Sequence, residues 1–330
     1  MALWAPLWGR GLLLPDLIAV EASLRAAPWA QRRQEDFVLV AAGDDKAVLA
    51  SCEVYEIPAE LDGTAVCVVL VASLFVEPAL RRHGYARELL EGVAAAAERR
   101  PGCVAVLLFS DIGTGYYERL GFRALCGAAP ADIVLPQLAS GAVPGVELVS
   151  AFGGLDERAL NAAMPAAAPD LLALPVELER AELVTIAEAS EAARRGRSPP
   201  AHRGARGEEG GEIAWLADYE EGELVVLVLS ARSPHEAATL LAAAQGEAAA
   251  AGLTKGVRLW DMPQPLAGGD ATAVATGGGA AAATAAAATV YGAEVDGAVR
   301  VPRTGKIPMV RALGGGEAVE RLFVQRISWG

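Results

Sequence analysis

The chain has 330 residues, enough for two domains of ordinary size. Its 41 acidic residues outnumber 28 basic ones, and the net charge of −13 argues against nucleic-acid binding, which depends on Lys and Arg neutralising phosphates. No strongly apolar stretch reaches the roughly 18 residues of a membrane span, and residues 1–20 lack the basic start of a signal peptide. We therefore expect a cytoplasmic protein without nucleic-acid or membrane partners, whose acidity serves either solubility or the attraction of a cationic substrate.

The first half of the sequence predicts a mixed α/β domain. An amphipathic helix is expected over Leu12–Ala27, and the continuous apolar run Ala65–Val76 is typical of a strand buried on both faces. A second helix, Arg87–Arg99, carries one apolar stripe and follows that run closely. The other expected elements are strands at Asp36–Ala41, Ala47–Ile57, Cys103–Ser110 and Ala131–Leu135, and a short helix at Thr114–Leu120 that Gly121 ends.

The second half predicts a similar but weaker pattern. We expect one domain over residues 1–145 and a smaller one over 146–330, in which 267–289 is an Ala/Gly-rich flexible insertion. The segment Ser198–Gly211 is expected to be a loop. The strand–strand–helix–strand order hints at a degenerate copy of the first half, with a helix at Leu183–Arg194, a hairpin of Glu212–Asp218 and Glu223–Leu229, a helix at Pro234–Ala251, and strands at Gly256–Trp260 and Leu322–Trp329.

Metal chemistry is not indicated. No two of the four cysteines form a C-x-x-C pair, and His83, His202 and His235 lie far apart in the sequence. Structural zinc sites usually show closely spaced ligands. We expect no metal, and buried thiols in a reducing compartment.

One short segment combines the features of an anion site. The run Val76–Ala86 ends a buried strand, passes through Arg81, Arg82, His83, Gly84 and Tyr85, and begins an amphipathic helix. Helix N-termini present backbone N–H groups and a partial positive charge, which suit phosphate. Gly84 lets backbone approach a diphosphate, and small Ala86 keeps the start of the helix open. By itself the pattern R-x-x-G-x-A is weak, because exposed arginines in a strand–loop–helix connection are common.

The order of the motifs is more specific than any one of them. The loop is followed by a second buried strand and then by Tyr116-Tyr117-Glu118-Arg119-Leu120-Gly121-Phe122. This pair of signals resembles the GNAT N-acetyltransferase superfamily. The resemblance implies the mixed-sheet GNAT fold and acetyl-CoA as co-substrate, held by Arg81–Ala86 and by the strand end at Phe75 and Val76. It implies Tyr117 as the general acid that protonates the leaving thiolate, with Tyr116 as its alternative, and a strand N–H near Phe75–Val76 as oxyanion donor.

A narrower resemblance concerns the substrate. The segments Ser51-Cys52-Glu53 and Ser110-Asp111-Ile112-Gly113 look like those of the fungal-type lysine N6-acetyltransferase family, as do Ile307-Pro308 and the closing Glu320…Trp329. Phe109, Phe122 and Gly330 depart from that family's pattern. The resemblance implies free L-lysine as the amine acceptor. Glu53 is then a general base or an ammonium-binding group; Asp111 either contacts substrate or caps the next helix; and Arg311 and Trp329 contribute to the lysine pocket.

Two other functions fit the same motifs. A protein, a peptide or another small amine could be the acceptor, because a sequence does not show whether a peptide groove exists. A GNAT-like domain could also bind acyl-CoA for regulation without turnover, although the presence of Arg81, Gly84 and Tyr117 argues against this. The second half lacks an R-x-x-G-x-G/A loop, so we assign it substrate closure or packing.

Overall fold

The computed structural model describes residues 13–124, 131–139, 141–161, 171–260, 287–290, 293–303, 305–314 and 321–324. By their contacts, the residues form two compact units. The first contains residues 1–127, 167–174 and 304–322, and the second contains 128–166, 175–303 and 323–330. The chain thus passes between the units more than once, whereas the sequence suggested a single boundary at 145. That boundary remains a prediction, because spatial contacts do not show which segments fold independently.

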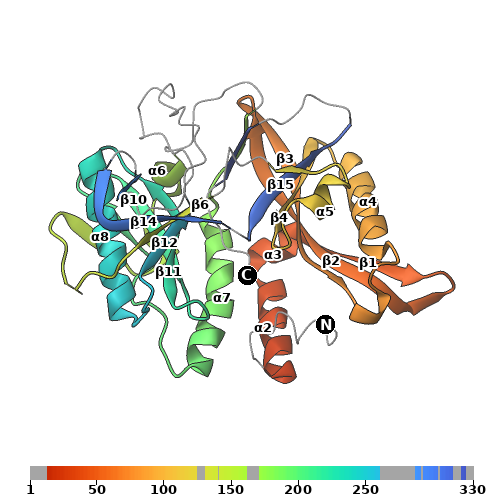
Figure 1. Cartoon of the computed structure of the whole chain (residues 1–330), viewed down its shortest axis with the longest axis horizontal. Helices are drawn as coiled ribbons and strands as arrows, with labels where there is room; N and C mark the ends of the chain where they lie inside the picture. The colour runs from red at the N-terminus through yellow and green to blue at the C-terminus, as the bar shows by residue number, and fades with distance from the viewer. Residues whose placement is uncertain are drawn as a thin grey trace. The chain divides into compact units, whose positions relative to one another are not determined.

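The first unit is built on a mixed sheet (Figure 1). Strand β2 is antiparallel to both β1 and β3. Helix α4 then carries the chain from β3 to β4, which is parallel to β3. Two helices, α2 and α3, precede the sheet. The bounds are α2 Leu14–Ala26, α3 Pro28–Arg33, β1 Gln34–Ala41, β2 Asp44–Leu61, β3 Thr64–Val76, α4 Tyr85–Glu98 and β4 Cys103–Ser110.

Later segments of the chain complete this sheet. Strand β15 (Ile307–Ala312) pairs antiparallel with β4 along six residues, and β5 (Arg123–Ala124) pairs with the other side of β15. Strand β8 (Leu171–Leu174) pairs with the end of β2, and β16 (Arg321–Val324) lies beside β8. The short helices η1 (Pro78–Leu80) and α5 (Gly115–Glu118) lie in connections. The first unit therefore needs chain from beyond residue 300.

The two faces of this sheet are covered by different helices. On one face, Leu89, Leu90 and Val93 of α4 pack against alternate residues of the strands, such as Cys52 and Val54 of β2. On the other face, Trp29 of α3 stacks on Tyr55 of β2 with ring centroids 5.8 Å apart. Because side chains alternate along a strand, Glu53 lies on the same face as Tyr55.

A β-bulge interrupts the pairing of β2 with β3. Ser51 pairs with Phe75 and Glu53 with Ala72, so β3 carries one extra residue between these pairs. Ser73, inside the bulge, has a φ of 52°, in the left-handed region that non-glycine residues rarely occupy. Such bulges re-aim side chains and occur next to active sites.

The second unit contains another mixed sheet. Helix α7 is followed by the antiparallel strands β9, β10 and β11, and α8 connects β11 to the parallel strand β12. Antiparallel β6 then borders β12, as β15 borders β4 in the first unit. This order repeats that of the first sheet. The bounds are β6 Ala131–Leu135, β7 Val146–Val149, η2 Phe152–Gly154, α6 Glu157–Asn161, α7 Leu178–Arg194, β9 Gly204–Gly207, β10 Glu212–Asp218, β11 Glu223–Ser230, α8 Pro234–Ala250, β12 Val257–Trp260, β13 Ala287–Val290 and β14 Ala293–Pro302.

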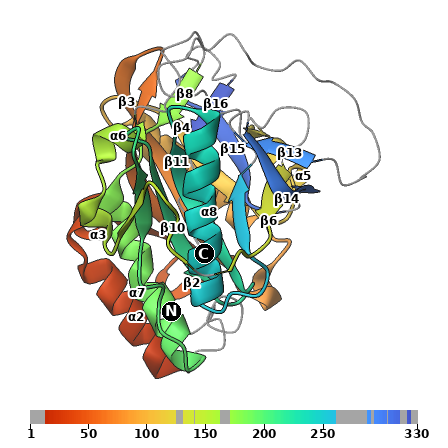
Figure 2. The ribbon, with the colours of Figure 1, turned by 90° about the vertical axis from the view of Figure 1, so that its left-hand side faces the viewer.

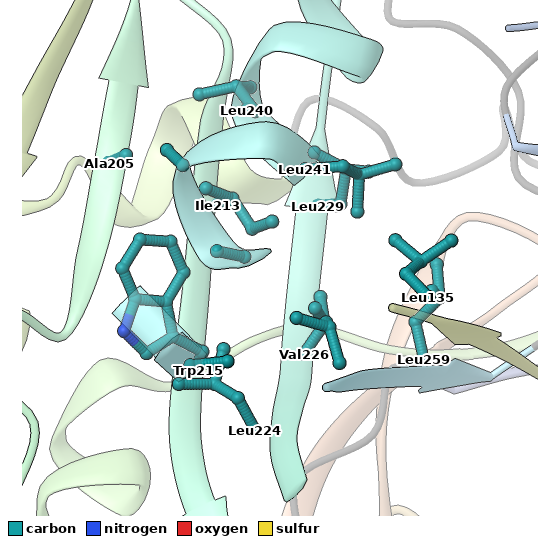
Figure 3. Packing of buried hydrophobic residues seen from close by; sticks show 14 of the residues in the cluster. Leu135, Ala205, Ile213, Trp215, Leu224, Val226, Leu229, Leu240, Leu241 and Leu259 are labelled. Carbon is teal, nitrogen blue, oxygen red and sulfur yellow. The ribbon is translucent and has the colours of Figure 1, made fainter. Parts of the chain in front are cut away.

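The core of the second unit lies between α8 and this sheet. Figure 2 shows α8 running across β10 and β11, and Figure 3 shows Leu240 and Leu241 of α8 above the apolar side chains of the strands. Trp215 is fully buried there, and its indole Nε1 donates to the carbonyl oxygen of His202 at 2.9 Å. Helix α7 packs on the opposite face, where Leu178 and Ala181 meet β10 and β11.

Most of the expected elements are confirmed, and one is wrong. The segment Ser198–Gly211, expected as a loop, contains the strand β9, which pairs with β7 and β10. Its sequence Gly-Ala-Arg-Gly has no strand pattern, but a side chain at Gly204 would lie 2.3 Å from the carbonyl oxygen of Ile213. Close backbone approach thus explains the glycine. The expected insertion 267–289 and the closing strand lie mostly outside the described residues, as does Trp329.

Candidate active site

The connection from β3 to α4 has the geometry of an anion site. Gly84 is the N-cap of α4 with a φ of 90°, and no side chain caps this end of the helix. A Cβ placed on Gly84 would meet no atom within 4 Å, so the space above the helix start is open. The first-turn amides of an α-helix have no partner within the helix, and here Gly84, Tyr85 and Ala86 begin that turn.

The same connection carries exposed basic side chains. Arg81, Arg82 and His83 are all exposed, and Arg82 has a φ of 68°. Arg81 Nε donates to the carbonyl oxygen of Val76 at 3.2 Å, which fastens the loop to the end of β3. The His83 ring stacks on Tyr85 with centroids 5.8 Å apart. The residues that the sequence grouped as a diphosphate site therefore lie together at one helix N-terminus, and they suit such a ligand.

The strands part just before this loop. The parallel pairing of β3 with β4 ends at Val71 and Leu108, whereas β3 continues to Val76. Phe75 is buried and Val76 half-buried, and both lie beyond the bulge at Ser73. The end of β3 thus leaves its neighbour immediately before the helix N-terminus.

Tyr117 lies in the short helix after β4. Its ring meets Phe122 edge to face with centroids 6.0 Å apart, and its carbonyl oxygen accepts from the amides of Leu120 and Phe122. Burial raises the pKa of the Tyr117 phenol to about 12, with smaller contributions from Tyr116 and Asp111. The phenol therefore keeps its proton at neutral pH, as a general acid must. The Tyr116 ring is 5.1 Å away, edge to face.

Glu53 is held by a network that the sequence did not predict. Its Oε1 accepts from Arg25 Nη2 at 2.9 Å, and its Oε2 accepts from Ser73 Oγ at 3.0 Å and Tyr55 Oη at 3.2 Å. Arg25, from α2, also forms an ion pair with Asp36 of β1. Residues of α2, β2 and β3 thus meet at one carboxylate beside the bulge, and β1 joins them through Arg25.

These same elements match a known family. Residues 34–124, which include β1 to β5, match the family model described as the acetyltransferase (GNAT) domain. The chain is accordingly an acetyltransferase with acetyl-CoA as its co-substrate, as the sequence predicted.

One solved structure supports the overall fold. The chain is similar to a conserved protein of unknown function from Enterococcus faecalis, a probable N-acyltransferase, with a TM-score of 0.52 and 12% identity over 94% of this chain and 69% of that one. It also matches a GCN5-related N-acetyltransferase from Kribbella flavida, with a TM-score of 0.46 and 16% identity over 94% and 68%. A GNAT family N-acetyltransferase from Escherichia coli in complex with CoA matches with a TM-score of 0.27 and 22% identity over 37% and 61%. No curated protein sequence matches this chain.

A second carboxylate of the first unit has an unusual environment. Glu21, one turn before Arg25 on α2, has its pKa raised to about 7 by burial first and by the charge of Glu53 second, and Arg25 opposes the shift. No signal in the sequence points to Glu21, Arg25 or Asp36, because nothing local shows which strands α2 covers. Ser73 lies in the apolar run Ala65–Val76, and nothing in that run predicts its bulged conformation.

Asp111 and Arg311 occupy other parts of the first unit. Asp111 Oδ1 accepts from the backbone amide of Lys306 at 3.1 Å, and the Lys306 ammonium is 3.4 Å from Oδ2. The alternative cap role for Asp111 is wrong, because Thr114 is the N-cap of α5 and no side chain caps that helix. Arg311 donates to the carbonyl oxygen of Leu120 at 3.3 Å. It follows Met309 on the sheet face that α4 covers, opposite to Glu53, so the structure does not bring these two residues together.

The described residues contain neither a membrane-spanning helix nor a cluster of metal ligands. None of the helices among the described residues is long and apolar enough to span a bilayer. In the same part of the chain, no three His, Cys, Asp or Glu side chains gather as metal ligands would.

Proposed function

We propose that this GNAT domain acetylates the ε-amine of free L-lysine. The observation that carries the proposal is the carboxylate network of Glu53 and Asp36 beside the bulge of β3, on the sheet face opposite α4. An amine acceptor arrives as an ammonium, and partly buried carboxylates recognise that charge. The choice of lysine rests on the resemblance of the Ser51–Glu53 and Ser110–Gly113 segments to lysine N6-acetyltransferases.

The cofactor loop orients the co-substrate. Arg81, Arg82 and the amides that begin α4 hold the diphosphate, and the open space above Gly84 lets it approach the backbone. The thioester then extends toward the end of β3, where a backbone N–H near Phe75–Val76 stabilises the oxyanion. Held in this way, the carbonyl is presented to the amine from the Glu53 side.

Glu53 and Tyr117 carry out the proton transfers. The lysine ε-amine has an unperturbed pKa of about 10.4, so its ammonium must lose a proton before it attacks. Among the described residues, Glu53 Oε2 accepts from two donors and Oε1 from one, and a carboxylate oxygen can accept two. Oε1 can therefore bind the ammonium or take its proton. As the C–N bond forms and the C–S bond breaks, Tyr117 gives its phenolic proton to the thiolate.

The acceptor is tested by comparing related amines. Acetyl-CoA turnover is followed through CoA release with free lysine, with ornithine, with lysine blocked at the α-amine and carboxylate, and with a lysine-containing peptide. We expect free lysine to give the highest kcat/KM. Preference for the peptide would replace the substrate proposal with a protein acetyltransferase, and the absence of turnover with every amine would support an acyl-CoA-binding regulatory domain.

Glu53 has a matched control on its own strand. Glu53→Gln keeps the shape and loses the charge, so KM for lysine should rise or kcat fall by about 10²-fold, the usual scale for one proton-transfer group. Glu60→Gln, an exposed change on β2, should leave both parameters unchanged. Equal kinetics for the two variants would remove Glu53 from the site.

A further inference from the structure

The second unit has a connection equivalent to the cofactor loop, but it is built differently. By the order of elements, the passage from β11 to α8 corresponds to the passage from β3 to α4. In the first unit the helix begins at Gly84 with no side-chain cap. In the second unit Ser233 is the N-cap, its hydroxyl accepts from the amide of Glu236 at 3.1 Å, and Pro234 follows. Part of the anion-binding end of α8 is thus used internally.

The carboxylate of Glu236 occupies the rest of the space at the N-terminus of α8, where a bound anion would lie. Its Oε2 accepts from the backbone amide of Arg232 at 2.8 Å, and its Oε1 accepts from the backbone amide of Gly211 at 2.8 Å. Glu236 is only 4% exposed. A negatively charged group at a helix N-terminus, bound by backbone amides, is the arrangement by which proteins hold phosphate. Here the chain supplies the anion itself.

The neighbouring backbone is fitted to this carboxylate. A Cβ at Gly211 would lie 2.4 Å from Glu236 Oε2, and one at Gly207 would lie 2.4 Å from Oε1. Both positions therefore require glycine as long as Glu236 stays where it is. This close fit contrasts with the empty surroundings of Gly84.

In the second unit, the sheet face that corresponds to the Glu53 face of the first unit is also filled by contacts within the unit. In the first unit, Arg25 of α2 is the one donor to Glu53 Oε1 among the described residues. In the second unit, α7 contributes Glu188, whose side chain is 2% exposed, pairs with Arg203 and accepts from the amide of Ala217 at 2.6 Å. Burial, partly opposed by Arg203, raises the pKa of Glu188. This carboxylate is thus committed to contacts inside the unit.

We infer that the second unit is a silent copy of the acetyltransferase fold, whose cofactor position is filled by Glu236, so that each chain binds one acetyl-CoA. The inference rests on the proposed use of acetyl-CoA by the first unit. It assigns the second unit a structural role, which includes carrying the chain to β15 of the first sheet.

The first test is the stoichiometry of CoA binding to the full chain by calorimetry. We expect one CoA per chain, and no binding after Gly84→Asp. Two sites, or one site that survives Gly84→Asp, would overturn the inference. A complete lack of binding by the wild-type chain would instead overturn the proposed function, so the two failures differ.

The second test removes the internal anion. In the Gly84→Asp background, Glu236→Ala frees the amides of Gly211 and Arg232, and inorganic pyrophosphate should then raise the melting temperature. In the Gly84→Asp variant that keeps Glu236, pyrophosphate should not change the melting temperature. No rise in the double variant, or a rise already in Gly84→Asp alone, would contradict the assignment of Glu236. Should Glu236→Ala fail to fold, the wild-type stoichiometry still decides the inference.

Discussion

Gly84→Asp separates cofactor binding from folding more sharply than any other change in the loop. Gly84 has a φ of 90°, and a non-glycine residue in the left-handed region costs about 1 kcal/mol. An aspartate at an N-cap offsets only a few tenths of a kcal/mol of this cost relative to glycine. The added Cβ meets nothing within 4 Å, so we expect the free energy of unfolding to fall by no more than about 1 kcal/mol.

The effect on CoA should be large by comparison. A carboxylate about 5 Å from one phosphate charge, at an effective dielectric constant of about 20, is repelled by about 3 kcal/mol. That free energy corresponds to a loss of roughly 200-fold in affinity. Calorimetric titration with CoA measures it, and urea unfolding checks stability.

The matched control is Gly84→Asn, which has the same shape and tolerance for a left-handed backbone but no charge. We expect Asn to bind CoA far more tightly than Asp at low salt, and the difference to shrink as salt screens the charges. Equal affinities for the two variants would refute the electrostatic reasoning and remove the loop assignment.

The other predictions concern the proposed general acid Tyr117, the buried carboxylate of Glu21, and Gly204 in the sheet of the second unit. Tyr117→Phe should lower kcat by about 10²-fold with acetyl-CoA still bound, and a variant with wild-type kcat would reduce Tyr117 to a packing residue. Glu21 has a folded pKa of about 7 against 4.5 in the unfolded chain, so the folded state retains a proton between these values and stability falls as pH rises through that window. Glu21→Gln should therefore gain stability over the wild type between pH 5 and 8, by about 1–2 kcal/mol after partial exposure is allowed for; urea titrations showing a constant difference would contradict this. Gly204→Ala should destabilise by about 1–3 kcal/mol through its clash with Ile213, whereas Gly92→Ala, in open space on α4, should stabilise slightly.

The strand, loop and helix of the proposed cofactor site could be predicted because their signals are local. A buried strand, a loop with arginines and a glycine, and an amphipathic helix follow one another within Ala65–Arg99, and Tyr117 comes shortly after the next strand. Each element carries its own periodicity or stop signal. The contacts among these residues follow from the right-handed strand–helix–strand connection.

The acceptor end could not be predicted because it depends on packing between distant segments. Arg25 reaches Glu53 only because α2 lies on the Tyr55 face of the sheet, and Ser73 turns toward Glu53 only because of the bulge. Strand β15 follows β4 by nearly 200 residues in the chain and pairs with it nonetheless. Strand β9 is defined by its two neighbours rather than by its glycine-rich sequence.

The proposed reaction moves acetyl from acetyl-CoA to the side-chain amine of free lysine. Mass spectrometry of the product formed from acetyl-CoA and free L-lysine, with fragmentation to locate the acetyl group, tests this proposal. We expect acetyl on the ε-nitrogen, formed by the wild type and about 10²-fold more slowly by Tyr117→Phe. Acetyl on the α-nitrogen, or no acetylated lysine at all, would contradict it.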